Sequence, residues 1–311
     1  RWGLPDMRFT IEYPVAAGGY DPALLTGDGM ARVVRTLEDE GYDAVAFTEH
    51  PAPSLKWMES GGHHSVDLVA ALAFCAARTE RLGLMTYLMV LPYHNPFAAA
   101  KALTTLELVS GGRVTVVAGA GYLRSEYLAM GIDFEVRNEI FDEAIVVMRG
   151  AWEQVPFHHE GTHFTAKGVA SLPRPPRPGG PPILIGGNSG IARRRAAANQ
   201  GWSPLLMDPG AKSATVRTPP MATIEEFATR VREVRERAAE VQGADSVTTV
   251  QIQTPHSGIL KTGGSWEEHR DHLGRLADAG ADSFVLQVPG EDVGRLEDLL
   301  AEYAREVLHR S

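Results

Sequence analysis

Short apolar runs alternate with longer stretches of helical periodicity along the whole chain, and this alternation constrains the fold more than any other feature. The apolar runs have the length of buried strands and occupy residues 8–14, 44–48, 82–91, 113–118, 183–186, 202–207, 247–253 and 283–288. The helical patterns that follow them occupy residues 28–40, 66–79, 96–109, 138–153, 190–199, 223–241, 266–279 and 293–309. Strands that alternate with helices are typical of a parallel sheet. Eight such pairs in 311 residues predict a closed (β/α)8 barrel, the TIM barrel, as a single domain over residues 1–311.

An insertion of about residues 154–182 separates the fourth expected strand from the fifth. Its first part, residues 154–170, predicts a β-hairpin that turns around Glu160 and Gly161. The proline-rich part, residues 172–182, predicts an extended lead-in to the fifth strand, because proline fixes φ and does not continue a helix.

A second irregular segment, residues 208–222, follows the sixth expected strand and carries Pro, Gly, Ser and Thr without periodicity. In a barrel, a segment that follows a strand lies at the active face. The pattern is consistent both with a lid over the active site and with an irregular spacer.

The composition is that of an ordinary globular protein, with 44% hydrophobic and 22% charged residues. The net charge is −9 and no run of Lys or Arg occurs, which argues against nucleic acid and anionic membranes as partners. No apolar stretch approaches the ~18 residues that span a bilayer, and residues 1–6 lack the pattern of a secretory signal. The single cysteine, Cys75, lies in an apolar helical run, so we expect a buried thiol and no intrachain disulfide. These features favour a cytoplasmic protein.

The reactive groups of a barrel lie at the carboxyl ends of its strands. The second expected strand ends in Thr48, Glu49 and His50. A carboxylate beside an imidazole can hold a ring nitrogen and move a proton. The alternative interpretation is that this histidine only caps a loop.

The fourth expected strand ends in Gly119, Ala120, Gly121 and Tyr122. Paired glycines permit a flat ligand to approach the backbone closely, or they only form a turn. A dinucleotide fingerprint would need a third glycine where Arg124 stands, so the Rossmann interpretation is weak.

The fifth expected strand runs into Gly186, Gly187, Asn188 and Ser189, and a helical pattern with three arginines follows at residues 193–195. Free backbone amides and the positive end of a helix dipole form an anion site. The segment therefore predicts a phosphate site, with plain helix capping by Ser189 as the alternative.

Residues His159 to His163 match the H-E-x-x-H pattern of zinc proteases. That chemistry needs both histidines on one face of a helix, whereas Gly161 and Thr162 favour a hairpin that would place the two imidazoles on different strands. His63 and His64, which follow two glycines, are predicted to lie in a loop rather than at a metal site. No metal ion is expected.

Taken in order, these pieces resemble the luciferase-like family of monooxygenases and dehydrogenases over roughly residues 8 to 290. The motifs that carry the resemblance are Ala46–His50, Asn95–Pro96 with Ser110–Arg113, Gly119–Glu126, Arg137–Glu143, Pro182–Gly187 and Gly201–Trp202. The residue sequences of these motifs are most similar to those of the branch described as probable coenzyme F420-dependent oxidoreductases.

The resemblance implies a barrel with an insertion between strands four and five, and a cofactor at the strand ends. That cofactor would be coenzyme F420, with FMN as the alternative. Glu49 and His50 would lie near the reactive ring, with His50 as proton donor or substrate contact. A non-proline cis peptide would fall near Thr86 and Tyr87. The implied cofactor contacts are Thr86, Tyr87, Met89, Gly119, Gly121, Tyr122, Ser125, Gly186, Gly187, Asn188 and Ser189.

The chain departs from the family at one position. Sugar-phosphate dehydrogenases of the family carry a glutamate directly after the second glycine of the strand-four motif, and this chain carries Tyr122. Sugar-phosphate dehydrogenation is therefore in doubt, and the small organic substrate stays open.

The resemblance implies hydride transfer if the cofactor is F420. With reduced FMN it implies oxygen insertion, with a separate flavin reductase as partner. Relatives are commonly homodimers. Two rival classes are a non-catalytic flavin carrier and a metal-dependent barrel hydrolase, and the Glu49–His50 pair argues against the first.

Overall fold

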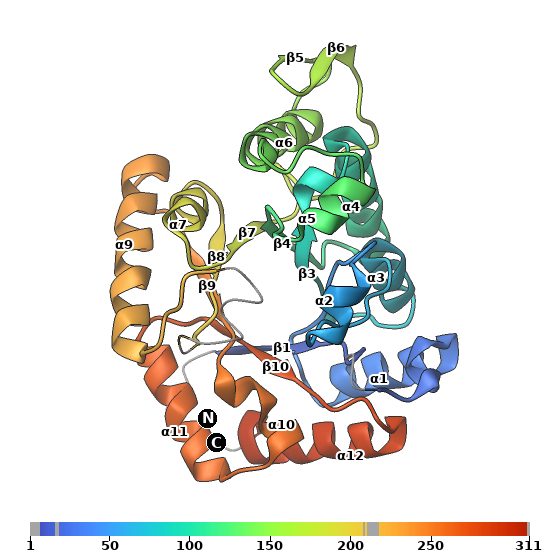
Figure 1. Ribbon diagram of the computed structural model, residues 1–311, viewed down its shortest axis with the longest axis vertical. Helices are drawn as coiled ribbons and strands as arrows, with labels where there is room; N and C mark the ends of the chain where they lie inside the picture. The colour runs from blue at the N-terminus through green and yellow to red at the C-terminus, as the bar shows by residue number, and fades with distance from the viewer. Residues whose placement is uncertain (1–6, 16–18, 208, 210–217, 310–311) are drawn as a thin grey trace.

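Eight parallel strands close into a barrel, as the alternation of strands and helices predicts (Figure 1). The computed structural model describes residues 7–15, 19–207, 209 and 218–309. Neighbouring strands follow one another around the barrel in the order β1-β10-β9-β8-β7-β4-β3-β2. Their bounds are β1 Arg8–Glu12, β2 Ala44–Phe47, β3 Gly83–Val90, β4 Val114–Gly119, β7 Ile183–Gly186, β8 Gly201–Ser203, β9 Thr249–Ile252 and β10 Ser283–Gln287. All eight expected strands are present, and the TIM-barrel prediction is confirmed.

Helices surround the barrel, and each of the eight expected ones forms (Figure 1). Their bounds are α1 Gly27–Asp39, α3 Leu68–Ala76, α4 Pro96–Ser110, α6 Arg137–Glu153, α7 Gly190–Ala197, α9 Ile224–Gln242, α11 Trp266–Asp278 and α12 Val293–Tyr303. Helix α4 shows how the sequence sets such limits. Asn95 accepts hydrogen bonds from the first turn, Pro96 occupies the first helical position, and Gly111 ends the helix at φ 68°.

Several short helical segments were not expected from the sequence, because they are too short to show a period. They are η1 Pro22–Leu25, α2 Leu55–Glu59, η2 Leu91–Tyr93, α5 Arg124–Ala129, η3 Pro255–Gly258 and α10 Ile259–Thr262. The helix expected at 293–309 ends in a π-helical turn, η4 Ala304–Leu308. Five of the short segments (η1, α2, η2, α5 and η3) are the first helical segment after a barrel strand. The sequence pattern therefore missed elements at the face where a barrel carries its active site.

Side chains that alternate along the strands separate two layers of packing. Val45 and Phe47 of β2 belong to the large cluster between the barrel and its helices. Ala44 and Ala46 belong to a smaller buried cluster with Met85, Val117 and Leu184. Because successive side chains of a strand point to opposite faces, the smaller cluster fills the inside of the barrel.

The insertion forms the expected hairpin, β5 Phe157–Glu160 with β6 Thr165–Val169, which projects beside α6 (Figure 1). Glu143 of α6 anchors it, because its carboxylate accepts a hydrogen bond from the Nε2 of His159 (3.0 Å) and another from the backbone N of His163 (2.9 Å). Burial would raise the pKa of Glu143, but hydrogen bonds to its carboxylate outweigh burial and hold the pKa below its ordinary value. His163 lies in the turn rather than on the second strand, so the expectation of two imidazoles on two strands was wrong in that detail.

Most of the expected lid, residues 208 and 210–217, lies outside the described residues. The described ends of this segment lie close together, since the backbone N of Met207 donates to the carbonyl of Met221 (2.8 Å) in an antiparallel bridge.

Cys75 is buried in α3, as expected, and burial raises the pKa of its thiol to about 12. Within the described ranges no helix is long and apolar enough to cross a membrane.

Candidate active site

A cavity of about 830 Å³ opens at the carboxyl ends of the barrel strands. Most residues that the sequence nominated lie in its wall: Glu49, His50, Tyr87, Gly119, Gly121, Tyr122, Gly186, Gly187 and Ser189. Four nominated residues lie outside the described lining of the cavity: Thr86, Met89, Ser125 and Asn188. The position of the cavity therefore agrees with the rule that barrels carry their active sites at the carboxyl ends of the strands, and Thr86, Met89 and Asn188 are held in the core by other contacts.

Glu49 does not contact the imidazole of its neighbour His50. Its carboxylate accepts hydrogen bonds from the backbone N of Val90 (2.6 Å) and from the Nε2 of His94 (2.8 Å). These contacts join the end of β2 to the end of β3. In this structure Glu49 shapes the wall of the cavity, and the carboxylate that holds the imidazole of His50 comes from elsewhere.

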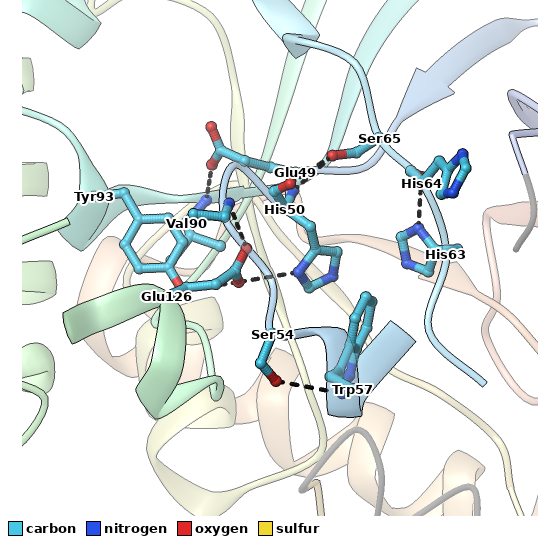
Figure 2. Close-up of polar contacts among 11 residues, drawn as sticks. Glu49, His50, Ser54, Trp57, His63, His64, Ser65, Val90, Tyr93 and Glu126 are labelled. Carbon is cyan, nitrogen blue, oxygen red and sulfur yellow. Dashed lines mark hydrogen bonds and ion pairs between the residues drawn. The ribbon is translucent and has the colours of Figure 1, made fainter. Parts of the chain in front are cut away.

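Glu126, on α5, supplies that carboxylate (Figure 2). Its Oε2 lies 3.0 Å from the Nδ1 of His50, and the side chains are 1% and 10% exposed. The backbone N of Ala52 (3.2 Å) and the hydroxyl of Tyr93 (3.2 Å) also donate to this carboxylate. Burial, followed by the charge of Glu126, raises the pKa of Tyr93 far above its ordinary value, so its hydroxyl keeps the proton that it donates.

The backbone of His50 is fixed as firmly as its ring. Its N–H donates to the hydroxyl oxygen of Ser65 (3.0 Å), and the same hydroxyl donates to the carbonyl of His50 (2.9 Å). Both rotation and translation of the imidazole are therefore restricted before any ligand binds.

Trp57 and His63 pack around His50 and line the cavity (Figure 2). The ring centroid of His50 lies 4.4 Å from that of Trp57 and 4.9 Å from that of His63. A Cβ on Gly62 would lie 2.4 Å from the indole, so only glycine permits this close approach. The Nε1 of Trp57 is buried and has no hydrogen-bond partner among the described residues. Such a donor costs about 1–3 kcal/mol, unless a ligand satisfies it.

His63 packs against His50 and Trp57 with a neutral ring. Its Nδ1 lies 2.9 Å from the carbonyl of His64, which only accepts, so Nδ1 carries the proton. Burial, with the nearby charge of His50, lowers the pKa of His63, although the carbonyl contact and the carboxylates of Glu12 and Glu126 act in the opposite direction. The sequence predicted only a loop for His63. The two glycines before His63 were the signal that could have indicated close packing.

Leu88 explains the glycines at the ends of β4 and β7. A Cβ on Gly119 would lie 2.6 Å from Leu88 Cδ1, and a Cβ on Gly186 would lie 2.5 Å from Leu88 Cδ2. The space beside these glycines therefore accommodates the side chain of Leu88, which lines the cavity. A non-proline cis peptide joins Tyr87 to Leu88, one position after the expected place.

Strand β3 divides its residues between the cavity and the core. Tyr87 lines the cavity and donates from its hydroxyl to Gln253 Oε1 (3.2 Å). Thr86 is buried and exchanges hydrogen bonds with the backbone of Val117, at 2.9 and 3.0 Å. Met89 packs in the outer core. Neither Thr86 nor Met89 is therefore placed to support the face of a ring in the cavity.

The helix α7 begins at the cavity wall with Ser189 as its N-cap, whose Oγ accepts from the backbone N of Ala192 (3.1 Å). The amides expected to bind phosphate are only partly free. The N–H of Gly187 donates to Ser203 (3.1 Å) and that of Asn188 to Thr218 (2.9 Å). An anion would instead meet the amides of Ser189 and of the first turn of α7.

The side chain of Asn188 is a structural tie rather than a cavity contact. It is 4% exposed, donates to the carbonyls of Leu205 (2.7 Å) and Pro219 (2.9 Å), and accepts from the N–H of Leu205 (2.9 Å). Two arginines also line the cavity: Arg137 at the start of α6 and Arg195 on α7. Arg195 pairs with Asp142 at 2.6 Å.

No group of three His, Cys, Asp or Glu side chains with the geometry of a metal site occurs in the part of the chain that the structure describes. The two histidines of the H-E-x-x-H pattern contact Glu143 and Glu139 of α6 instead.

A family model described as luciferase-like monooxygenase matches residues 7–255. The chain belongs to this luciferase-like monooxygenase family. It is accordingly an oxidoreductase, and the cavity at the strand ends is the candidate active site of this luciferase-like enzyme.

The names of the relatives of this luciferase-like enzyme refer to more than one cofactor. A Mycobacterium tuberculosis protein named as uncharacterized is 28% identical over 223 residues, 67% of this chain and 72% of that protein. The FMNH2-dependent dimethylsulfone monooxygenase of Pseudomonas putida is 30% identical over 143 residues, 45% of this chain and 38% of the relative. The F420-dependent glucose-6-phosphate dehydrogenase of Beutenbergia cavernae is 32% identical over 164 residues, 51% of this chain and 46% of the relative.

The solved structure of the monooxygenase RslO1 from Streptomyces bottropensis has the same fold. It superposes with a TM-score of 0.80 over 97% of this chain and 99% of that one, at 20% sequence identity.

Proposed function

We propose that this luciferase-like enzyme transfers hydride between coenzyme F420 and a small, uncharged organic substrate that carries a hydroxyl or carbonyl group. The observation that carries the proposal is the buried His50–Glu126 pair in the wall of the cavity. Hydride transfer at an alcohol or carbonyl carbon requires a proton to leave or reach the adjacent oxygen, and these residues can handle that proton.

The described residues fit a cofactor with a flat ring and a phosphate-bearing tail. A cavity of about 830 Å³ lies within the range of about 300–1,000 Å³ that small-molecule sites occupy. The amides of Ser189, Gly190 and Ile191 at the start of α7 would hold the phosphate. The hydroxyl of Ser189 accepts from Ala192 N and keeps its own hydrogen to donate. When bound, F420 would supply the hydride chemistry, and the chain supplies orientation and proton handling.

The charges around the other end of the cavity favour an uncharged substrate. Glu12 and Glu126 both lie close enough to His63 to act on its charge, and both line the cavity. An anionic substrate group there would meet two carboxylates.

A titration of the purified protein with F420 and, separately, with FMN tests the proposal by absorbance and fluorescence. We expect tight binding of F420 and weak binding of FMN. Tight binding of FMN alone would contradict the F420 assignment and favour an oxygen-using monooxygenase with a separate reductase. Binding of neither would remove the support for a phosphate site at Ser189 and the start of α7.

The variant Ile191→Asp tests the phosphate position, with Ile191→Asn as its uncharged match. Ile191 lies in the first turn of α7, lines the cavity and is 40% exposed, so both variants should fold. A carboxylate beside a bound phosphate should raise the Kd for the cofactor about tenfold over that of Ile191→Asn, or about 1.4 kcal/mol. The difference should shrink as salt screens it. Equal Kd values for the two variants would place the phosphate elsewhere.

A further inference from the structure

Glu126 holds a buried negative charge, and two of its three partners, His50 and Tyr93, line the active-site cavity. Its side chain is 1% exposed, and it accepts from the Nδ1 of His50, the backbone N of Ala52 and the hydroxyl of Tyr93 (Figure 2). Among the described residues, His50 is its one ion-pair partner. Because no arginine or lysine among the described residues pairs with this buried carboxylate, its charge acts mainly on the imidazole of His50.

The carboxylate also decides which ring nitrogen of His50 carries hydrogen. An ionised carboxylate only accepts hydrogen bonds, so the Nδ1 that faces Glu126 at 3.0 Å must be the donor. In the neutral ring Nε2 then has a free lone pair. His50 lines the cavity, so that lone pair belongs to the active site.

We propose that Glu126 is the positioning residue of this site: it holds His50 in the Nδ1–H tautomer, so that Nε2 can accept a proton from a substrate hydroxyl. The chemical step rests on the function proposed above. With F420 bound to accept the hydride from the adjacent carbon, the O–H bond of the alcohol would break and its proton would go to Nε2. The carbonyl forms, His50 becomes an imidazolium, and the carboxylate of Glu126 balances its charge.

The contrast with Glu49 shows why the role falls to Glu126. Both are glutamates in the cavity wall, and Glu49 is the direct neighbour of His50 in sequence. The carboxylate of Glu49, however, is turned to Val90 and His94. Only the more distant residue, 76 positions along the chain, reaches the imidazole of His50.

The variant Glu126→Gln makes a sharp prediction because of the hydrogen bond from Ala52. A backbone N–H can donate only to the amide oxygen, so this oxygen should take the place of Oε1. The amide NH2 group then faces both the Nδ1 of His50 and the hydroxyl of Tyr93, which rotates, and both must accept. His50 should therefore invert to the Nε2–H tautomer, with Nε2 blocked as a proton acceptor.

The ¹⁵N chemical shifts of the His50 ring, measured without cofactor at a pH where the ring is neutral, report this tautomer directly. We expect Nδ1–H in the wild type and Nε2–H in Glu126→Gln, together with a fall in kcat of about 100-fold or more and little change in the Kd for F420. The matched variant Glu49→Gln should keep the Nδ1–H tautomer.

The wild-type tautomer alone can overturn the proposal, even if Glu126→Gln fails to fold. Nε2–H in the wild type would refute it, as would full turnover by a correctly folded Glu126→Gln. Inversion in Glu49→Gln would also refute it, because the effect would not be specific to Glu126. Absence of F420 turnover in the wild type would instead reject the proposed function, while the ring shifts would still decide the tautomer.

Discussion

Histidines gather in two regions at the carboxyl ends of the strands, and the regions differ in the groups that contact the imidazole nitrogens. At the end of β2, His50 contacts the buried carboxylate of Glu126. Across the barrel, at η3 and α11, three histidines stack on one another. The ring centroids of His256 and His272 are 3.9 Å apart, and those of His256 and His269 are 6.2 Å apart.

Hydroxyl groups, not carboxylates, contact the stacked rings. The Nε2 of His272 lies 3.1 Å from the hydroxyl of Thr254, and the Nε2 of His269 lies 2.9 Å from that of Tyr303. Burial, followed by the neighbouring imidazoles and Arg270, lowers the pKa of His269 to about 3. Burial, with His256 and Arg275, lowers that of His272 to about 4.

The comparison shows that the partner decides what a buried imidazole can do. A carboxylate stabilises the imidazolium that forms when the ring takes a proton, so the His50–Glu126 pair suits proton transfer. A hydroxyl gives no such charge compensation, so His269 and His272 stay neutral and serve packing. Substitutions in the first region should therefore change turnover, whereas the second region should affect the free energy of unfolding at acid pH.

The largest expected effect comes from His50→Ala. Removal of the proton-handling ring should lower kcat about 10²- to 10⁴-fold, while the Kd for the cofactor changes by less than about threefold. Steady-state kinetics and a binding titration measure the two quantities. His256→Ala, which removes an exposed ring of the stack, should leave kcat within a few-fold of the wild type. Loss of cofactor binding without loss of kcat in His50→Ala would contradict the role assigned to His50.

An intermediate effect is expected from acid on the stack. The pKa of His269 is lower in the folded chain than its ordinary value of about 6.5, so its stabilising contribution is complete above that pH and is lost as pH falls toward about 3. The contribution of His269 to the free energy of unfolding should fall by about 1.4 kcal/mol for each unit by which the pH is lowered. Between pH 6.5 and pH 5 the loss is about 2 kcal/mol.

Denaturant unfolding of His269→Phe at several pH values measures this contribution. The variant loses the hydrogen bond to Tyr303 at every pH, but its stability should depend less steeply on pH than that of the wild type. His64→Gln, at an exposed histidine, should keep the wild-type slope. Equal slopes for the wild type and His269→Phe would show that the stack does not carry the acid sensitivity.

The fold could be predicted because strand and helix periods are local patterns, and closure of eight pairs follows from topology. The place of the site followed as well, since Glu49, His50 and Tyr122 directly follow strands. The partner of His50 could not be predicted, because Glu126 reaches it only through the packing of α5 against the barrel mouth.

Strand β3 shows a second limit of sequence patterns. A regular strand alternates its faces, but the pairing of β3 with β4 shifts register between Tyr87 and Met89. Tyr87 and Leu88 therefore both line the cavity, while Thr86 and Met89 are buried elsewhere. An irregularity of one residue has no signature in a periodic pattern, so the sequence could not show that Met89 leaves the face of Tyr87. Thr86 lies on the opposite face from Tyr87 by ordinary alternation, and only the resemblance had nominated it.

The smallest expected effect comes from His94→Gln, which asks whether a carboxylate partner alone makes an imidazole functional. His94 pairs with Glu49 at 2.8 Å, in the same chemical arrangement as His50 with Glu126, but it lies outside the described lining of the cavity. The pair is partly exposed, so its loss should lower the free energy of unfolding by less than about 1 kcal/mol. We expect kcat within about threefold of the wild type, since a glutamine can still donate to Glu49. A fall in kcat that approaches that of His50→Ala would show that Glu49 and His94 belong to the proton-handling group, and the contrast between the two glutamates would no longer hold.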